Sequence, residues 1–410
     1  MSYKFLLKPI FFILSLLSGT YLILYIEKLN PSDLGSLENI FEKKNIIEKS
    51  KYYPLRNFKR LSIKEKKIAS IAWKYFENNF NNSTGLVNAM DGHPSSNLSD
   101  MTNYLMGMIS AYEIGIIDSN TFDFRITRFL KSLSIIQLYQ NKLPNKFYNT
   151  NTLRMTDENN VNTNIGIGWS ALDIGRFFCF VNKIRFDYPQ YTAKLQQAIN
   201  NWKLNEMITD GYLYSVTIDK SKKANKIQEG ILGYEEYCSK GLFLQGYDAS
   251  EALLYNDFTK FIKIYNNEIA VDTRQKENQP KSNYLHSDAY ILEGIEYGWN
   301  INSKELVYRI FKAQKERYLQ TTIMTSIGED YSENHKTIST KIAFAWYVLF
   351  NDFYADLIYK NILTLYSPQR GWYSGKYEET GLPDKFITCN TNGAILEALN
   401  YKMKGRIIKF

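Results

Sequence analysis

The sequence predicts an all-α fold, namely an (α/α)6 toroid of about twelve helices with small β-hairpin insertions, preceded by one N-terminal transmembrane helix. Apolar residues recur at helical spacing in about a dozen segments, and polar, Asn-rich connections separate these segments. The alternation of strands and helices that would indicate a parallel sheet does not occur in the sequence. The 410 residues are 44% hydrophobic and 15% aromatic, which is enough to build a large core. Six helical hairpins wound into a ring use all of these segments.

The first helix is expected at 63–80, where Ile68, Ile71 and Tyr75 share a face and a polar Asn-Asn-Ser-Thr-Gly run follows. The other helices are expected at 101–116, 121–139, 169–184, 191–207, 234–247, 249–255, 287–297, 303–318, 339–350, 352–365 and 391–403. Strand character is expected at 212–218 and at 261–272, where Asn266 and Asn267 favour a hairpin turn. A superhelical repeat array and an irregular helical domain are the alternatives, but no fixed-period motif supports the array.

The N-terminal region has the pattern of a membrane anchor. Residues 9–26 are uncharged and mostly apolar, and Lys4 and Lys8 precede them, so residues 1–8 are expected to stay in the cytoplasm. Residues 27–62 are charged and are interpreted as a tether, and residues 63–410 as the exported domain. A cleaved signal peptide is the alternative to a single-pass anchor.

Composition excludes several classes of function. The net charge of +8 arises largely from lysines and arginines near the N-terminus, so no nucleic-acid partner is expected. Three cysteines do not make a disulfide framework, although a bridge between Cys238 and Cys389 is conceivable. The three histidines are not spaced as ligands, and no EF-hand loop occurs. Neither a metal nor a cofactor is therefore expected.

The most informative motif is GYEEY at 233–237, which places Glu235 and Glu236 at the beginning of a predicted helix between tyrosines and a glycine. A carboxyl group in such a partly apolar setting suits the general acid of a glycosidase. The alternative is that both carboxylates only interact with the helix dipole.

Six connections mix aromatic and acidic residues, as carbohydrate sites do, and we expect them to line a bowl at one end of the toroid. They lie at 84–100, 166–176, 229–237, 285–299, 325–330 and 370–381. Each has a structural alternative: Asp173 pairs with Arg176, Asp100 caps a helix, and Trp169 belongs to the core.

Several segments together resemble a bacterial family, that of domain of unknown function 3131. They are TGLVN, SDMTNYLMGMISAYEIGII, GIGWSALDIGR, EGILGYEEY, STKIAFAW, GWYSGKYEETG and TCNTNGAILEALNYK, within about 69–405. The family is described as glucoamylase-like and is similar, more distantly, to (α/α)6 enzymes that act on β-1,2-glucans. Those enzymes carry a Gly-Tyr-Asn-Glu box whose Glu is the general acid. The resemblance implies that Glu236 is the acid and that Glu235 replaces the Asn. The chain departs from the family pattern at Ser99, Ile231 and Asp288.

The resulting hypothesis is a glycoside hydrolase, anchored in a bacterial inner membrane with a periplasmic or extracellular body, that cleaves a β-glucan or an exopolysaccharide. The resemblance implies inversion. The candidates for the second carboxylate are Asp100, Asp173, Glu329, Asp330 and Glu378. The candidates for substrate binding are Trp169, Tyr234, Glu235, Arg176, Asp288, Trp299, Trp372, Tyr373, Asn390 and Asn392. The alternatives are a catalytically silent polysaccharide-binding component of an export or assembly machine, and a transglycosylase or lyase on the same scaffold.

Overall fold

The computed structural model describes residues 47–409, apart from 220, 222, 229, 256–257, 275–286 and 328–335, together with Gly19. The chain divides into two units, and residues 46–409 make up the larger one. The anchor predicted at 9–26 lies, except for Gly19, outside the described residues. Within the part of the chain that is described, no helix combines the length and the apolar character needed to cross a membrane.

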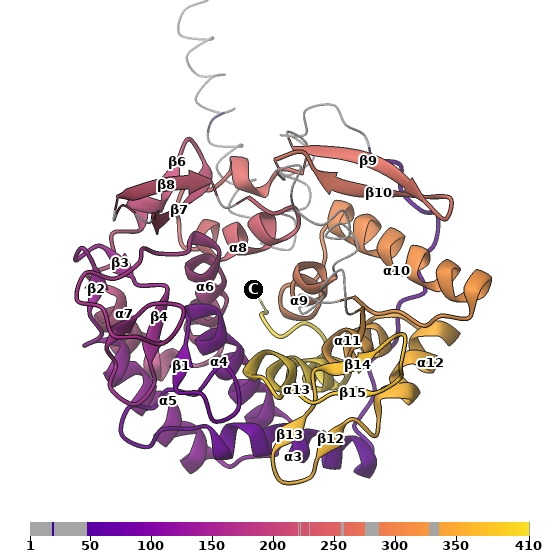
Figure 1. The fold of residues 1–410 in the computed structure, drawn as a ribbon, viewed down its shortest axis with the longest axis horizontal. Coiled ribbons are helices and arrows are strands. Elements are labelled where there is room, and N and C mark those ends of the chain that lie inside the picture. The colour runs from indigo at the N-terminus through magenta and orange to yellow at the C-terminus, as the bar shows by residue number, and fades with distance from the viewer. Residues whose placement is uncertain are drawn as a thin grey trace, which may run out of the picture. The chain divides into compact units, whose positions relative to one another are not determined.

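The larger unit is a double ring of helices (Figure 1). The inner helices are α4 (Leu98–Glu113), α6 (Ala171–Asp187), α8 (Tyr234–Phe243), α9 (Asp288–Glu296), α11 (Thr340–Leu349) and α13 (Cys389–Lys404). Each packs against the next, and α13 packs against α4 to close the ring. The outer helices are α3 (Ile63–Asn78), α5 (Ser119–Leu133), α7 (Thr192–Ile199), α10 (Ile301–Thr321) and α12 (Phe353–Ile362). Outer and inner helices alternate along the chain, as the predicted toroid requires.

One outer position of the ring is not filled by an α-helix. Between α8 and α9, the prediction of a helix at 249–255 is wrong, because only the 3-10 turn η4 (Glu251–Leu253) forms there. A hairpin of β9 (Thr259–Ile264) and β10 (Asn267–Asp272) follows, and β10 packs against α10 (Figure 1). The described residues therefore contain eleven α-helices rather than twelve.

The remaining strands are short, pair antiparallel and mostly precede the inner helices. One sheet contains β1 (Ser95–Ser96), β4 (Phe147–Asn149) and β5 (Met155–Thr156), and another contains β6 (Ile208–Thr209), β7 (Tyr212–Ile218) and β8 (Ala224–Gln228). A third contains β11 (Thr337–Ser339), β14 (Gly375–Tyr377) and β15 (Pro383–Asp384). The pairs are β2 (Leu138–Tyr139) with β3 (Leu143–Pro144), and β12 (Tyr366–Ser367) with β13 (Gly371–Trp372). Two further 3-10 turns are η2 (Pro189–Tyr191) and η3 (Leu204–Met207), so the helix predicted at 191–207 is shorter than expected.

Neighbouring inner helices run in the same direction. Near the beginnings of α4 and α13, the Sγ of Cys389 lies 3.2 Å from the backbone carbonyl oxygen of Asp100. Farther along the two helices, a Cβ on Gly107 would lie 3.0 Å from the Cα of Gly393, so the glycines allow the two backbones to approach closely. Near their ends, Asn400 donates to Glu113 at 2.9 Å. Likewise, Asp288 begins α9 and Lys341 lies in the first turn of α11, and these two residues form an ion pair. We call the end of the ring at which the inner helices begin the loop end.

The C-terminal tail closes the opposite end of the ring. The backbone N–H groups of Ile407 and Ile408 donate to the carbonyls of Ile295 and Glu296, at 3.0 and 2.8 Å, where α9 ends. Both isoleucine side chains are buried, and Lys183 of α6 donates to the carbonyl of Ile407 at 2.8 Å. Viewed down the ring, the tail lies in the middle (Figure 1).

The segment before α3 packs against the body. Ser50 and Tyr53 donate to Glu305 of α10 at 2.8 and 2.7 Å, and Leu55 bridges to Phe350. The compact unit therefore begins at residue 46, upstream of the boundary predicted at 63. All three cysteines are buried and none of them forms a disulfide bond, so the conceivable bridge between Cys238 and Cys389 is not present.

Candidate active site

Glu236 lies in the first turn of α8, at the loop end. Its side chain is buried, and its Oε2 accepts a hydrogen bond from the backbone N–H of Gly233 at 2.6 Å. Burial, and then the charge of Glu235, raise the pKa of Glu236 well above its ordinary value. The backbone N–H groups of residues 233 and 236 and the cation of Arg274 offset this only in part. Burial and the charge of Glu235 both favour the protonated form of this carboxyl, which is the form that a general acid needs.

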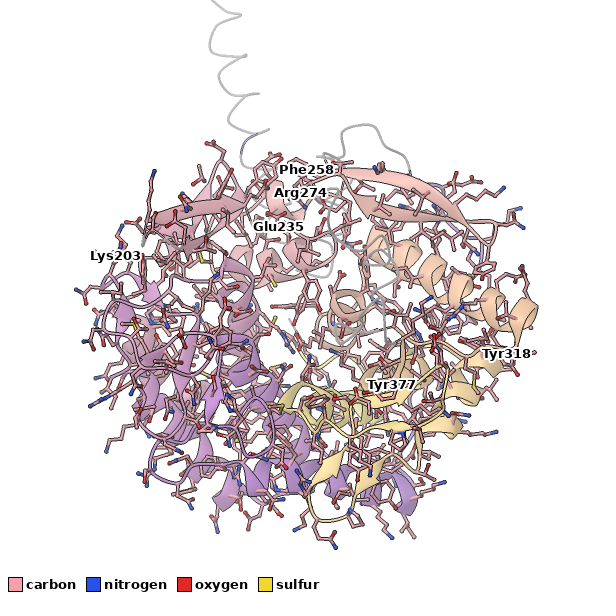
Figure 2. All side chains as sticks on the ribbon, in the orientation of Figure 1. Lys203, Glu235, Phe258, Arg274, Tyr318 and Tyr377 are labelled. Atoms are coloured by element: carbon pink, nitrogen blue, oxygen red, sulfur yellow. The ribbon has the colours of Figure 1, made fainter. Side chains whose placement is uncertain are left out.

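Glu235 has different contacts from its neighbour. Its Oε2 accepts from Arg274, and its Oε1 accepts from the backbone of Leu213 at 3.3 Å. Arg274, at the end of the β9–β10 hairpin, also donates to Asp272 at 2.7 and 3.0 Å and lies 4.1 Å from the centre of the Phe258 ring. Glu235, Arg274 and Phe258 meet at one side of the ring (Figure 2). Because this carboxylate is committed to Arg274, Glu236 is the better candidate for proton transfer.

Two candidates for the second carboxylate lie in first turns of other inner helices. Asp100 is in α4 and Asp173 is in α6, and both are partly exposed. The N-caps of these helices are Asn97 and Ser170, whose side chains accept from the backbone N–H groups of residues 100 and 173. The caps are thus supplied by neighbouring residues. Both aspartates face the same end of the ring as Glu236 and remain predictions for the base.

Glu378 lies farther from the inner ring. Its Oε2 accepts from Arg317 of the outer helix α10 at 2.8 Å, and its side chain is only 2% exposed. This ion pair joins the β14 sheet to the outer wall, so Glu378 is a weak candidate for the base. Glu329 and Asp330 lie outside the described residues.

Three predicted substrate-binding residues are covered by protein. Trp169 is 3% exposed and donates to the carbonyl of Tyr214 at 3.0 Å, and Trp372 is fully buried and donates to the carbonyl of Ile68 at 3.2 Å. The side chain of Asn392 is committed to both backbone groups of Trp372, at 2.9 and 3.2 Å. In this structure they fix loops to helices, and neither ring offers a free face for a sugar.

Trp299 follows the end of α9, away from the loop end. Its ring stacks on Phe350 with centroids 5.5 Å apart, and its N–H donates to the carbonyl of Tyr290 at 2.6 Å. The rest of the predicted set lies at the loop end: Tyr234, Tyr373 and Asn390 are partly exposed, whereas Asp288 is buried and paired with Lys341. Their role in binding stays a prediction.

Arg176 belongs to a buried polar cluster that sequence reasoning missed. Its Nη1 donates to Ser99 of α4 at 3.2 Å, and its Nη2 lies 3.7 Å from Glu296 of α9. Glu296 accepts from Tyr237 of α8, and Glu397 of α13 is buried beside it. The available signal was a charged residue inside an apolar helical segment, as Glu397 is in AILEAL and Lys341 is in TKIAFAW.

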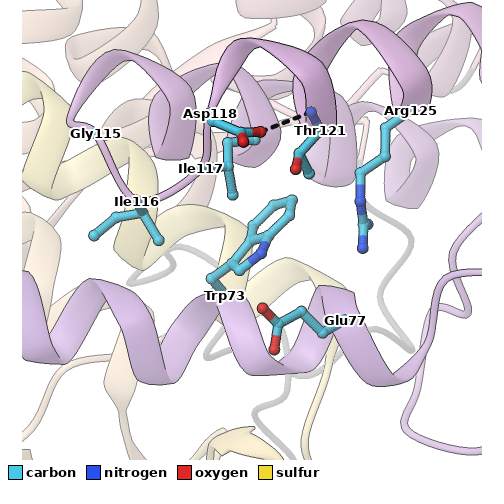
Figure 3. Close-up of a pocket in the computed structure, with 8 residues that line it drawn as sticks. All are labelled: Trp73, Glu77, Gly115, Ile116, Ile117, Asp118, Thr121 and Arg125. Carbon is cyan, nitrogen blue, oxygen red and sulfur yellow. Dashed lines mark hydrogen bonds between the residues drawn. The ribbon is translucent and has the colours of Figure 1, made fainter.

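A pocket of about 500 Å³ lies elsewhere, on the outer wall between α3 and the connection from α4 to α5 (Figure 3). Its lining residues are Trp73, Glu77, Gly115, Ile116, Ile117, Asp118, Thr121 and Arg125. The guanidinium of Arg125 lies 4.7 Å from the centre of the Trp73 ring, which leaves the indole 4% exposed. The pocket borders the end of α4, so it is separate from the loop end.

No group of three or more His, Cys, Asp or Glu side chains with the geometry of a metal site occurs within the described part of the chain. The loop end instead offers a buried carboxyl with a raised pKa at the beginning of one inner helix and further carboxyl groups at the beginnings of others. Proton donation by one and activation of water by another is the chemistry of glycoside hydrolysis.

Residues 67–335 and 328–405 match the model of a family described as protein of unknown function (DUF3131). None of the curated proteins matches the sequence.

Three solved structures illustrate the similarity of the fold. A putative glucoamylase from Bacteroides fragilis has a TM-score of 0.61 at 11% identity, covering 85% of this chain and 93% of that one. An endo-β-1,2-glucanase from Chitinophaga pinensis, in complex with sophorotriose and glucose, has a TM-score of 0.59 at 12% identity, covering 85% and 94%. The endo-β-1,2-glucanase from Talaromyces funiculosus with sophorose has a TM-score of 0.57 at 11% identity, covering 84% of each chain. At these identities the similarity shows the fold.

Proposed function

Since the chain belongs to the DUF3131 family, we propose that it is a glycoside hydrolase that cleaves a β-glucan or another exported polysaccharide by general acid/base catalysis. The observation that carries the proposal is Glu236, a carboxyl buried at the loop end, where burial and the charge of Glu235 raise its pKa. The fold that it shares with endo-β-1,2-glucanases and glucoamylases supports the choice of substrate class.

In this mechanism Glu236 protonates the oxygen of the leaving sugar as the glycosidic bond breaks. A carboxylate at another inner-helix terminus removes a proton from the attacking water, directly or through a sugar hydroxyl, and Asp100 and Asp173 are the described candidates. We expect inversion, because water then attacks the face of the sugar opposite the acid. Glu235 keeps its negative charge next to Glu236 through the ion pair with Arg274.

The proposal extends to location. Residues 9–26 anchor the protein in a bacterial inner membrane, with the N-terminus in the cytoplasm and the body on the far side. The support is the apolar stretch itself with Lys4 and Lys8 before it.

The test uses the full-length chain, purified in mild detergent because of its apolar N-terminal stretch, and the Glu236→Gln variant. Both are incubated with β-1,2-, β-1,3- and β-1,4-glucans, α-glucans and a panel of exopolysaccharides, and mass spectrometry identifies the products. We expect cleavage of one polymer and a loss of about 10²–10⁴-fold in kcat in the variant.

An aryl glycoside with a good leaving group provides the control. The aryl group of such a substrate leaves without receiving a proton, so Glu236→Gln should cleave the substrate nearly as well as the wild type does. Polymer cleavage that survives the substitution would show that Glu236 is not the acid. A chain that binds a polymer and releases no product would favour the silent polysaccharide-binding component.

A further inference from the structure

The centre of the ring contains two buried carboxyl groups that the proposed mechanism does not use. Glu296 lies at the end of α9 and Glu397 lies in α13, and neither side chain is exposed to solvent. The Oε2 of Glu296 accepts a hydrogen bond from the hydroxyl of Tyr237, whereas neither oxygen of Glu397 has a hydrogen-bond donor in the described part of the chain. An ionised carboxylate with no donor is costly inside a protein.

A proton on Glu397 removes this cost. Two ionised carboxylates cannot hydrogen-bond to each other, but a protonated Glu397 can donate to Glu296. Burial, and then the charge of Glu296, raise the pKa of Glu397 well above its ordinary value, and Arg176 offsets this only in part. Two buried carboxyl groups this close to each other are expected to share one proton, so that the pair retains one negative charge.

Arg176 connects this pair to the loop end. Its guanidinium is a permanent cation, 4% exposed, with Nη2 3.7 Å from Glu296. Its Nη1 donates to Ser99 at 3.2 Å, one residue before Asp100 in the first turn of α4. The Sγ of Cys389 also donates to the backbone carbonyl of Asp100, at 3.2 Å. A single negative charge on the carboxyl pair balances the single positive charge of Arg176.

We propose that Glu296 and Glu397 share one proton, that the charge they retain fixes Arg176, and that Arg176 is a positioning residue which orders the first turn of α4 and thereby places Asp100. The two claims about the carboxyl pair stand by themselves. The role of Asp100 rests on the proposed function, because its position matters to catalysis only if the loop end hydrolyses a glycan.

Infrared spectroscopy counts the shared proton in the intact protein at neutral pH. The variants are Glu296→Gln, Glu397→Gln and the double variant, and each spectrum is subtracted from that of the wild type in the region of protonated carboxylic acids. If the pair holds one proton, each single variant loses one band, because the remaining carboxyl takes the negative charge that Arg176 requires. The double variant also loses only one band. Two bands lost in the double variant would mean two protons, and no band lost would mean none; either result overturns the proposal.

Thermal unfolding of the same variants tests the charge balance. Glu397→Gln keeps the donor to Glu296 and should unfold within about 2 °C of the wild type. The double variant leaves Arg176 buried without a counter-charge and should unfold about 5–10 °C lower. Its loss should exceed the sum of the two single losses, because either carboxyl alone can carry the charge. Additive or negligible losses contradict a single shared charge.

Hydrogen exchange tests the positioning claim without any assay of activity. In Arg176→Gln, and in the double variant, backbone amides in the first turn of α4 should exchange about tenfold faster than in the wild type, while Glu397→Gln should leave them unchanged. The matched control is Arg185→Gln, which removes an arginine of the same helix that donates to Gln245 at the protein surface. Unchanged exchange in Arg176→Gln would refute the positioning role.

The catalytic readout separates this inference from the proposed function. If a glycan is cleaved, Arg176→Gln should lower kcat more than it raises KM, because a misplaced base affects the reaction step more than substrate binding. If no glycan is cleaved although the infrared and exchange results hold, the hydrolase proposal fails and the carboxyl pair stands.

Discussion

Glu235 and Glu236 carry the same functional group in the same helical turn, and their contacts give them different roles. Arg274 binds Glu235, and Asp272 accepts three further hydrogen bonds from the guanidinium of Arg274. Glu236 is buried next to this carboxylate and accepts a hydrogen bond from the backbone of Gly233. The negative charge of Glu235 therefore makes ionisation of Glu236 less favourable, which is how adjacent carboxyls can divide acid chemistry between them.

This arrangement predicts the pH dependence of Glu235→Gln. A general acid must be protonated, so activity is lost as pH rises through the pKa of Glu236. The charge of Glu235 raises that pKa, so its removal should lower the pKa and move the alkaline limb of the kcat/KM profile to lower pH. The control is Glu77→Gln, which neutralises an exposed glutamate on α3 and should leave the profile in place. A shift to higher pH, or no shift, would contradict the electrostatic role of Glu235.

At single positions, the sequence predicted the surroundings of the proposed acid better than those of the tryptophans proposed to bind sugar. The charge and helical position of Glu236 can be read locally. Trp169 and Trp372 lie in glycine-containing connections that look exposed, but their rings are buried by Tyr214 and Ile68, which are distant in sequence. Long-range packing of this kind leaves no local pattern. Glu397 does carry a local signal, a charge inside an apolar segment, but its pairing with Glu296 of another helix cannot be read from that signal.

At the scale of the element, α8 depends on the turn before it. Gly233 is the N-cap, with a φ of 90°, and a Cβ there would lie 3.0 Å from the ring of Tyr290 in α9. A side chain at this position is therefore strained by the backbone and by the neighbouring helix. Both effects act at the residue whose N–H contacts Glu236.

Gly233→Ala should lower the free energy of unfolding by about 1 kcal/mol for the left-handed backbone and by about 1–3 kcal/mol more for the contact with Tyr290. Gly246→Ala is the matched control: it follows the same helix with a φ of 85°, and a Cβ there meets nothing within 4 Å. Chemical denaturation of both variants measures the difference. Equal losses would show that Tyr290 yields freely and that the turn tolerates a side chain.

The outer helix α10 holds residues 47–62 against the body through Glu305. Its carboxylate accepts from Arg309 at 2.7 Å, from Tyr53 at 2.7 Å and from Ser50 at 2.8 Å. Burial alone would raise the pKa of Glu305, but these hydrogen bonds outweigh burial and lower it. A carboxylate with a lowered pKa stabilises the fold at neutral pH, and this stabilisation disappears as pH falls through the lowered value.

Glu305→Gln should therefore lower the free energy of unfolding by about 3 kcal/mol at pH 7, because it removes the nearest counter-charge of buried Arg309 and leaves only Glu268, which is largely exposed and lies 3.5 Å away. The gap from the wild type should narrow at pH values below about 4.5, the ordinary pKa of Glu, where the wild-type carboxylate also becomes protonated. Glu316→Gln on the same helix, which loses only a contact with exposed Gln320, is the control. A gap independent of pH would mean that the carboxylate charge does not hold the segment.

The strand and hairpin expected from their residue patterns are present in the structure, whereas the short helix expected after α8 is not. The strand expected at 212–218 coincides with β7, and the hairpin at 261–272 forms with its turn at Tyr265 and Asn266, both with positive φ. The helix expected at 249–255 spans seven residues, and a segment of that length gains too few backbone hydrogen bonds to form a helix without packing. The hairpin beside α10 occupies that side of the ring instead.

At the scale of the whole ring, the two ends differ in a way that suits a binding site. Every inner helix begins at the loop end, so backbone N–H groups and acidic first turns gather there. At the other end the tail pairs with α9 and buries Ile407 and Ile408. Lys183 contacts the tail carbonyl and also pairs with Glu113 at 2.7 Å, so the closure joins α4, α6 and α9. The tail thus keeps water from the buried interior at the end opposite Glu236, Asp100 and Asp173.

A chain that stops at Gly405 should for this reason lose stability while keeping its loops. Removal of two buried isoleucine side chains should lower the free energy of unfolding by about 3–6 kcal/mol, and the opened end should bind a hydrophobic dye. Ile408→Val provides a graded control, with an expected loss of about 1 kcal/mol and no dye binding. Denaturation and dye fluorescence measure the two effects. A truncated chain that is as stable as the wild type and binds no dye would mean that the inner helices seal this end by themselves, without the tail.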